Sequence, residues 1–397
     1  MCYGKNDLRN LKHTKPLEQT RVALVHEWPV MYGGSEQVVA TILDIFPEVD
    51  LYALVCDPEE LRGTPLENAS FQTSFIQSLP KSRKKYRWYL PLMPLAVEQL
   101  DLRPYDIVIS SSHAVAKGVL TRANQLHVSY THTPVRYAWD LYLDYLASSG
   151  LERGIKSYMA RITLHYLRLW DSVAANRVDA YLANSFYVKR RIEKLYRRPA
   201  QVIYPPVDVE RYRSDLPRED FFLAVSRFVP YKRMDLIVEA FTRMGKPLVV
   251  IGGGPEFEKV QSLAGRNVKL LGHQPDDVVT DYLQRACAFV FAAEEDFGIV
   301  AVEAQAAGCP IIAYGRGGAL ETVQGWPDPG ATGVFFDAQT PESVEKAVDL
   351  FEAHADEFSS EACRSNAERF SRERFMMEFR STVEDLWERF QHGEELE

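Results

Sequence analysis

The sequence of 397 residues has few of the features that define specialised protein classes. No apolar run approaches the roughly 18 residues that a membrane-spanning helix needs. The first 20 residues are polar and lack the apolar region of a signal peptide. The five cysteines are odd in number and irregularly spaced, so they form neither a disulfide framework nor a zinc pattern. We therefore expect a cytoplasmic protein whose thiols are small core side chains.

An excess of positive charge is also missing, because 46 Lys and Arg face 55 Asp and Glu, which gives a net charge of -9. This balance argues against a nucleic-acid binder, although it leaves room for a local basic patch. There is no G-x-G-x-x-G stretch, which argues against a dinucleotide-dependent oxidoreductase. The composition, 46% hydrophobic and 25% charged, is that of a globular protein, and the length predicts two domains.

Short apolar runs bounded by polar or turn residues recur in both halves and predict strands. In the first half they lie at residues 21–28, 49–55, 105–112 and 126–132. In the second half they lie at residues 220–228, 247–254, 268–273, 287–293 and 309–315. Helical patterns at residues 35–46, 234–244 and 276–286 separate several of these runs. The alternation predicts an α/β protein with two doubly wound, Rossmann-like parallel sheets.

The prolines in VIYPPVDVERYRSDLPRED mark the boundary between the two series, since proline disfavours helix. We expect a polar leader at residues 1–20 and a first domain at residues 21–205. A hinge at residues 206–217 then leads to a second domain at residues 218–375. The amphipathic helix of residues 376–397 is expected to cross back to the first domain.

One charge, Glu303, stands inside the apolar part of EEDFGIVAVEAQAAGCPIIAYG, residues 294–315. Glu295 follows a strand, and residues 297–308 predict a helix that begins at Phe297 and closes at Gly308. Ligands of open α/β sheets bind at the carboxyl ends of strands and at helix N-termini. A lone carboxylate on a buried helix is costly without partners. Ribose hydroxyls are suitable donors, and a structural arginine is the alternative.

The pair Glu295 and Glu303, with seven residues between them, resembles the signature of the retaining GT-B glycosyltransferases of family 4. The resemblance covers most of the chain and is strongest at residues 222–323. It implies that the first domain binds the acceptor, the second binds a nucleotide sugar, and the two face each other across a cleft. It also implies that Glu295 contacts the donor sugar and Glu303 the nucleotide ribose. We expect the phosphates on the amides near Phe297, Gly298, Ile299 and Val300, while Glu294 and Asp296 only complement the helix dipole.

Two cations follow the first strand of the second domain, in AVSRFVPYKRMD. A diphosphate that becomes a leaving group needs positive charge, and the family places an Arg and a Lys here. The resemblance therefore assigns Arg227 and Lys232 to the diphosphate, with Arg233 as a substitute for Lys232. A solvated basic loop is the alternative.

Glycine pairs occur at three further strand ends. Gly33 and Gly34 follow the first strand, and the resemblance implies that their loop closes over the donor phosphates. Gly317 and Gly318 precede an expected helix and either bind the donor or form a turn. The glycines of residues 252–254 are expected to shape the backbone around the nucleotide.

His132, in SYTHTPVRYAWD, follows a strand of the first domain. The family often has a histidine near the reacting sugar carbon, so we expect His132 to orient donor or acceptor without acting as the base. A core or capping histidine is the alternative. Arg136 is a candidate for a phosphate of donor or acceptor. The stretch THTPVRY also resembles a branch that includes bacterial mannosyltransferases of polysaccharide assembly.

A basic stretch interleaved with aromatics, PKSRKKYRWYLPLMP, suits an anionic membrane surface or a phosphorylated lipid. RNA binding uses similar chemistry, and a solvated helix face is the plain alternative. The docking residues expected here are Lys81, Arg83, Lys84, Lys85, Arg87 and Trp88. They would place the enzyme at the inner face of the plasma membrane.

These patterns and the resemblance together predict a retaining hexosyltransferase. We expect transfer of mannose from GDP-mannose to a hydroxyl of a lipid-linked glycan, such as lipopolysaccharide, without an obligatory metal or a cofactor. UDP-glucose or UDP-GlcNAc are alternative donors. A sugar-nucleotide epimerase, a phosphorylase and a non-catalytic glycan- or lipid-binding scaffold are the other readings.

Overall fold

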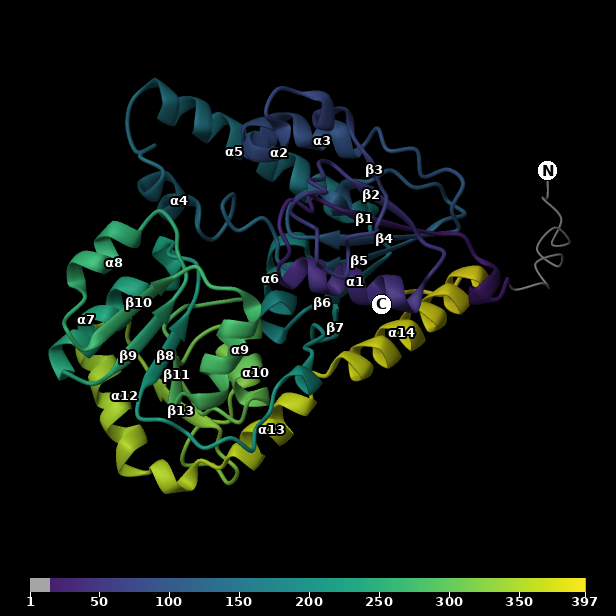
Figure 1. Ribbon diagram of the computed structural model, residues 1–397. Coiled ribbons are helices and arrows are strands. Elements are labelled where there is room, and N and C mark those ends of the chain that lie inside the picture. Colours follow the sequence, from purple (N-terminus) through teal and green to yellow (C-terminus); the bar gives the residue numbers. More distant parts are fainter. Residues whose placement is uncertain (1–14, 397) are drawn as a thin grey trace, which may run out of the picture. The chain divides into compact units, whose positions relative to one another are not determined.

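The computed structural model describes residues 15–396 and divides into two compact units. The divisions fall between Tyr204 and Pro205 and between Phe375 and Met376, and the elements are labelled in Figure 1. Most of the expected polar leader, residues 1–14, lies outside the described residues. Its last part holds a short 3-10 helix, η2 (Leu17–Gln19), in which Leu17 is buried.

The first unit is built on a seven-stranded sheet with the order β3-β2-β1-β4-β5-β6-β7, in which every neighbouring pair is parallel. The strands are β1 (Val22–His26), β2 (Asp50–Ala53), β3 (Phe71–Thr73), β4 (Ile107–Ser112), β5 (Leu126–Thr131), β6 (Ala180–Ala183) and β7 (Gln201–Val202). The central strands β1, β4 and β5 are buried throughout, as expected for a sheet covered on both faces. The chain order reverses between β1 and β4, which makes this the switch point of the sheet.

Helices and 3-10 turns connect these strands. They are α1 (Gly34–Ile45), η3 (Phe75–Ser78), α2 (Ser82–Lys85), η4 (Tyr86–Leu92), α3 (Met93–Val97), η5 (Ala116–Gly118), α4 (Tyr142–Ser148), α5 (Ile155–Ala174), η6 (Ala175–Arg177) and α6 (Phe186–Tyr196). The last helix, α14 (Arg372–His392), belongs to this unit from Met376 onward. Its Phe379 is buried against Tyr130 of β5, with ring centroids 6.1 Å apart.

The second unit holds a six-stranded parallel sheet with the order β10-β9-β8-β11-β12-β13. The strands are β8 (Phe222–Val225), β9 (Leu248–Ile251), β10 (Val268–Gly272), β11 (Ala288–Phe291), β12 (Ile311–Tyr314) and β13 (Gly333–Phe336). The connections include η7 (Val209–Arg211), η8 (Pro230–Lys232), α7 (Met234–Met244), α8 (Phe257–Leu263), α9 (Asp276–Arg285), α10 (Ile299–Ala306), α11 (Ala319–Thr322), α12 (Pro341–Ala353), η9 (Ala355–Glu357) and α13 (Ser360–Glu368). Two doubly wound α/β sheets were predicted, and this prediction is confirmed.

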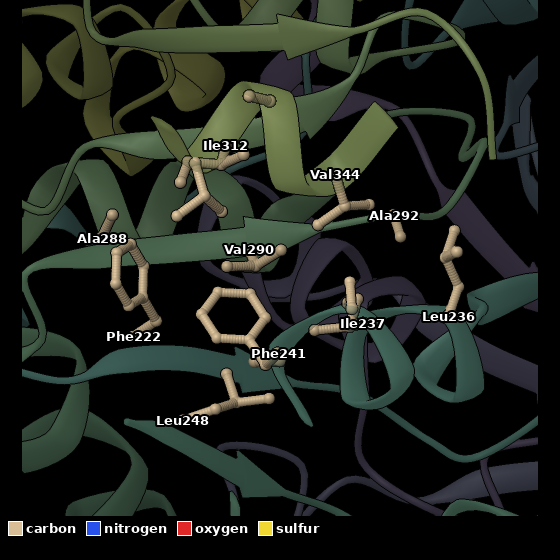
Figure 2. Packing of buried hydrophobic residues seen from close by; sticks show 14 of the residues in the cluster. Phe222, Leu236, Ile237, Phe241, Leu248, Ala288, Val290, Ala292, Ile312 and Val344 are labelled. Atoms are coloured by element: carbon tan, nitrogen blue, oxygen red, sulfur yellow. The ribbon is translucent and has the colours of Figure 1, made fainter. Parts of the chain in front are cut away.

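The core of the second unit holds α7 against its sheet. Phe241 of α7 packs among Phe222 of β8, Leu248 of β9 and Val290 of β11 (Figure 2). The rings of Phe222 and Phe241 are 5.0 Å apart between centroids. Because α7 begins two residues after Lys232, this packing fixes the loop between β8 and α7 at the carboxyl edge of the sheet.

Candidate active site

The switch point of the second sheet lies between β8 and β11, and the loops that follow these two strands carry predicted site residues. Lys232, at the end of η8, forms an ion pair with Glu295, which follows β11. Their side chains are 15% and 19% exposed, so the pair is shielded yet reachable. The structure thus brings together the cation predicted for the diphosphate and the acid predicted for the sugar.

The other two cations of this loop have different surroundings. Arg227 is exposed, and it takes part in no ion pair among the described residues. Arg233 has a left-handed backbone, with φ of 54°, and its guanidinium lies 3.4 Å from Asp235 and donates to Gln339 over 3.2 Å. Arg233 is therefore held by neighbours, whereas Arg227 is available to a ligand.

The helix that follows Glu295 starts later than predicted. Gly298 has a φ of +87° and caps α10, whose first residue is Ile299. The prediction that the helix begins at Phe297 is wrong, because the left-handed turn at Gly298 interrupts the helical backbone there. Phe297 is buried, and its ring contacts Phe370 at 5.4 Å between centroids. The amides at the helix start are consequently those of Ile299 and Val300.

The glycines predicted near the donor shape the loops at this edge. A side chain at Gly317 would place its Cβ 2.4 Å from the backbone oxygen of Glu295, and the Gly318 N–H donates to that oxygen over 2.8 Å. A Cβ at Gly252, where φ is +134°, would lie 1.8 Å from the oxygen of Ser226. Glycine is therefore required where the loops after β12 and β9 press on those of Glu295 and Arg227.

Glu303 lies one turn into α10 and is partly buried. Its carboxylate accepts a hydrogen bond from the Tyr212 hydroxyl, and the positive charge of Arg211 is near. Burial raises the pKa of Glu303 to about 7, against the opposing effects of Arg211 and Tyr212. The ion pair found for Arg211 among the described residues is with Asp276, over 3.4 Å. A structural arginine was the alternative for Glu303, and Arg211 is near it without an ion pair between the two.

Tyr212 and Arg211 were not predicted as site residues, because their segment was read as a hinge from its prolines. Their separation from Glu303 in the sequence also hides the contact. The signal that was available is the pairing of a cation with an aromatic hydroxyl five and six positions after the second of the two prolines.

In the first unit, the glycine pair marks the start of α1. Gly33 is the N-cap residue, and its N–H donates to Glu36 Oε2 over 3.1 Å. Glu36 also accepts from the Ser35 hydroxyl over 2.9 Å, and its other oxygen lies 3.1 Å from His26 Nε2. The loop is thereby tied to the carboxyl end of β1.

His132 belongs to a chain of polar groups at the carboxyl ends of β1, β4 and β5. Ser111 Oγ lies 2.8 Å from His132 Nε2 and 3.1 Å from His26 Nδ1. Burial alone would lower the pKa of His26, but the Glu36 carboxylate outweighs it and raises that pKa. Burial lowers the pKa of His132 to about 3. His132 is therefore neutral, and in the tautomer in which Nε2 accepts from the Ser111 hydroxyl the ring hydrogen is on Nδ1.

A second carboxylate at this edge of the sheet, that of Glu27, was not predicted. Glu27 is fully buried after β1, and one of its oxygens accepts from the backbone N–H groups of His113 (2.9 Å), Ala114 (2.8 Å) and Ala116 (3.0 Å). Its other oxygen lies 2.9 Å from His113 Nδ1. Burial by itself would raise the pKa of Glu27, but His113 and these amides hold it well below its usual range. Glu27 therefore fixes the orientation of His113, whose side chain is 23% exposed.

The remaining predicted residues of the first unit are not part of the polar network around His132. Arg136 is partly buried in the turn after His132, where its carbonyl accepts from the Leu141 N–H over 2.9 Å. The basic stretch forms α2 and η4, and its predicted docking residues are exposed. Lys85 lies over the Trp88 ring, 4.9 Å from its centroid. Within residues 15–396, no cluster of three or more His, Cys, Asp or Glu side chains is arranged to hold a metal.

Sequence comparisons agree with this geometry. Residues 208–370 match the family described as "Glycosyl transferases group 1", and residues 32–211 match "Glycosyltransferase Family 4". The chain belongs to the GT-B glycosyltransferases of family 4. The predicted family is thereby confirmed.

Two family members illustrate how similar the chain is to its relatives. An uncharacterized glycosyltransferase of Methanocaldococcus jannaschii is 28% identical over 227 residues, which are 55% of this chain and 63% of that protein. A GDP-mannose-dependent alpha-(1-6)-phosphatidylinositol monomannoside mannosyltransferase of Mycobacterium tuberculosis is 33% identical over 200 residues, 41% of this chain and 50% of that protein. The chain thus spans between half and about two thirds of these relatives.

Among solved structures, Anabaena HepE in complex with UDP has the same fold. The TM-score is 0.66 at 15% identity, and the match covers 92% of this chain and 100% of HepE. At this identity the likeness shows the GT-B fold alone.

Proposed function

We propose that the protein is a retaining hexosyltransferase that binds a nucleotide sugar at the carboxyl edge of its second sheet. The Lys232–Glu295 ion pair carries this proposal, because it joins a cation suited to a phosphate with an acid suited to sugar hydroxyls. Glu303 then receives the ribose hydroxyls, one helical turn from the amides of Ile299 and Val300. Family membership supports the same assignment.

In this scheme the donor replaces the internal ion pair. Lys232 turns to the diphosphate, exposed Arg227 adds a second charge, and Glu295 is released to hold the sugar. The bond between the anomeric carbon and the phosphate oxygen breaks, and the acceptor oxygen bonds to the same face of that carbon. The acceptor proton passes to the departing phosphate. Such preorganised charge stabilises a leaving anion without a metal, so we propose metal-independent transfer.

His132 acts as a hydrogen-bond donor in this scheme. Its Nε2 is occupied by Ser111, and its low pKa keeps the ring neutral, so Nδ1 offers a proton and no base. We place the loop of Gly33 and Gly34 over the donor phosphates, and Arg136 near a phosphate of donor or acceptor.

We propose GDP-mannose as the donor and a lipid-linked glycan of surface polysaccharide assembly as the acceptor. The mannosyltransferase relative of Mycobacterium tuberculosis and the THTPVRY stretch support this choice. UDP-glucose and UDP-GlcNAc are the competing donors, and HepE is a protein of the same fold with UDP bound.

The donor is tested by thermal stabilisation with a panel of nucleotide sugars, followed by assays of transfer and hydrolysis. A bound ligand raises the unfolding temperature by mass action, so GDP-mannose should give the largest shift. A larger shift with a UDP-sugar would replace the donor. The absence of any shift, transfer or hydrolysis would leave the scaffold reading.

The role of Lys232 is tested at saturating donor. Lys232→Ala should lower turnover by about 10²–10³-fold, the usual scale for one group that stabilises a transition state. Lys269→Ala is the matched control, because Lys269 is exposed on edge strand β10. Turnover in Lys232→Ala equal to that of the control would contradict the assignment.

A further inference from the structure

Among the helices that connect strands of the first unit, α5 is the longest, and it exposes a stripe of apolar side chains. Its exposed apolar residues are Ile155, Tyr158, Met159, Ile162, Tyr166, Leu169 and Val173, each between 45% and 85% exposed. Their spacing of three and four residues places them on one face of the helix. Over about 18 residues at roughly 1.5 Å each, the stripe is about 27 Å long. A contiguous apolar surface of this size marks an interaction site.

The stripe is not needed to hold α5 in the fold. The opposite face of the helix packs into the core through Leu164, Leu167 and Ala174. At the end of the helix, Trp170 donates to Glu98, which directly follows α3, over 2.8 Å. The helix therefore has one apolar face that packs on the core and a second apolar face that is exposed.

The charges that α5 itself carries beside the stripe have one sign. Lys156, Arg161 and Arg168 flank it, and the single acid of α5, Asp171, is fully buried and paired with Lys117. No acidic side chain of α5 thus faces the outside. Two copies of α5 packed on each other would bring like charges together, so charge disfavours a self-dimer. It favours an anionic surface.

The basic segment of α2 and η4 belongs to the same unit. Its Tyr86 and Tyr89 pack against the cluster that includes Leu164 and Leu167 of α5, and Figure 1 shows α2 and α3 near α5. Residues 81–97 hold five cations and no acid, and Trp88 is 67% exposed. The acid that follows, Glu98, is paired with Arg177 over 2.7 Å.

We infer that α5 is an interfacial helix that lays its apolar stripe into the surface of an anionic lipid bilayer, with its own cations beside the stripe. An amphipathic helix with cations beside its apolar face binds in this way, parallel to the membrane. Within residues 15–396 no helix is long and apolar enough to cross a bilayer, so α5 would lie on the surface. The inference does not depend on the proposed transfer reaction.

The test is sedimentation of the full chain with vesicles of phosphatidylcholine, with and without phosphatidylglycerol. Binding should require phosphatidylglycerol and weaken with salt. Ile155→Ser, Met159→Ser and Ile162→Ser combined should lower it by at least about tenfold, because three buried apolar side chains are lost. Leu320→Ser with Met377→Ser is the control, since these exposed residues lie on α11 and α14.

Insertion is read directly by Ile162→Trp, whose fluorescence should shift to shorter wavelength with anionic vesicles only. Nucleotide-induced thermal stabilisation of the triple variant should equal that of the wild type, which excludes misfolding. A wild-type dimer that the triple variant converts to a monomer, with no vesicle binding, would overturn the inference in favour of a second copy. Equal vesicle binding by the triple variant and the control would also overturn it.

Discussion

Glu303 carries a carboxyl whose pKa is raised by burial to about 7, where small changes in surroundings alter its charge. Ribose hydroxyls donate to the ionised form, so a bound nucleotide should lower this pKa. We expect nucleotide binding to release protons near neutral pH and to strengthen as the pH rises from about 6 to 8. Titration calorimetry in buffers with different ionisation enthalpies measures the release. Glu303→Gln should abolish it.

The raised pKa of Glu303 also predicts how the stability of the ligand-free protein depends on pH, which serves as a control. Its folded pKa lies above the ordinary value of 4.5, so the folded state holds the proton more tightly and loses stability as the pH rises through 7. At about pH 8, Glu303→Gln should therefore unfold at a higher temperature than the wild type. At about pH 5 this difference in unfolding temperature should be smaller. A proton release that persists in Glu303→Gln would assign it to another group.

Single residues were predictable where each followed its own strand. Lys232 and Glu295 each follow a predicted strand, and the two side chains meet because β8 lies beside β11 in the sheet. Tyr212 was not predictable, because its contact with Glu303 joins distant segments and depends on how η7 folds. Glu27 was missed because a single acid after a strand has no pattern, and only the fold brings the amides of residues 113–116 to it.

The buried pair of Lys117 and Asp171 fastens η5 to α5. Asp171 also accepts from Trp139 over 2.8 Å and from the Tyr196 hydroxyl over 3.0 Å. Lys117→Met leaves this carboxylate buried without its cation, which should lower the free energy of unfolding by about 3–5 kcal/mol. Urea denaturation followed by circular dichroism measures the change.

An exposed pair gives the comparison for that experiment. Arg62 and Glu59 are 2.9 Å apart at the surface, with both side chains more than half exposed. Arg62→Met should change the free energy of unfolding by less than about 1 kcal/mol, as exposed pairs contribute little. If Lys117→Met costs no more than this, the two remaining partners, Trp139 and Tyr196, are enough to hold Asp171, and the prediction is wrong.

Elements with a strong apolar pattern were predicted and others were not. The strands β1, β4, β8 and β11 are apolar runs and lie where predicted. The edge strand β3 is largely exposed, and β7 has two residues, so neither carries a pattern. The short strand β6 was also missed. The helix α5 was not predicted, and its sequence does not distinguish the core face from the exposed stripe, because both are apolar.

At the level of the whole molecule, the proposed donor residues belong almost entirely to the second unit. We expect a nucleotide to slow hydrogen exchange at residues 211–212, 226–234 and 294–303, because ligand contacts suppress local opening there. In the first unit the α1 start at residues 33–36 should respond if its loop closes over the phosphates, together with the turn at residues 132–136. Hydrogen exchange with peptide mass spectrometry, with and without ligand, measures this distribution.

The Lys232→Ala variant serves as the reference for this map, since it should lose protection at residues 226–234 while its ligand-free exchange stays unchanged. Protection spread evenly over the first sheet would place the donor elsewhere. The two-sheet plan itself was predictable, because the strand and helix pattern restarts after the prolines of residues 205–217. The compact units divide after Tyr204 and after Phe375.

The division of α14 has a consequence for biosynthesis. The second unit is one continuous stretch, whereas the first is assembled from segments on both sides of it. A nascent chain can complete the second unit while Phe379 and Trp387, which the first unit buries, are still inside the ribosome. A premature stop codon just after Phe375 would therefore damage the fold whose sheet was translated earliest and spare the one translated later.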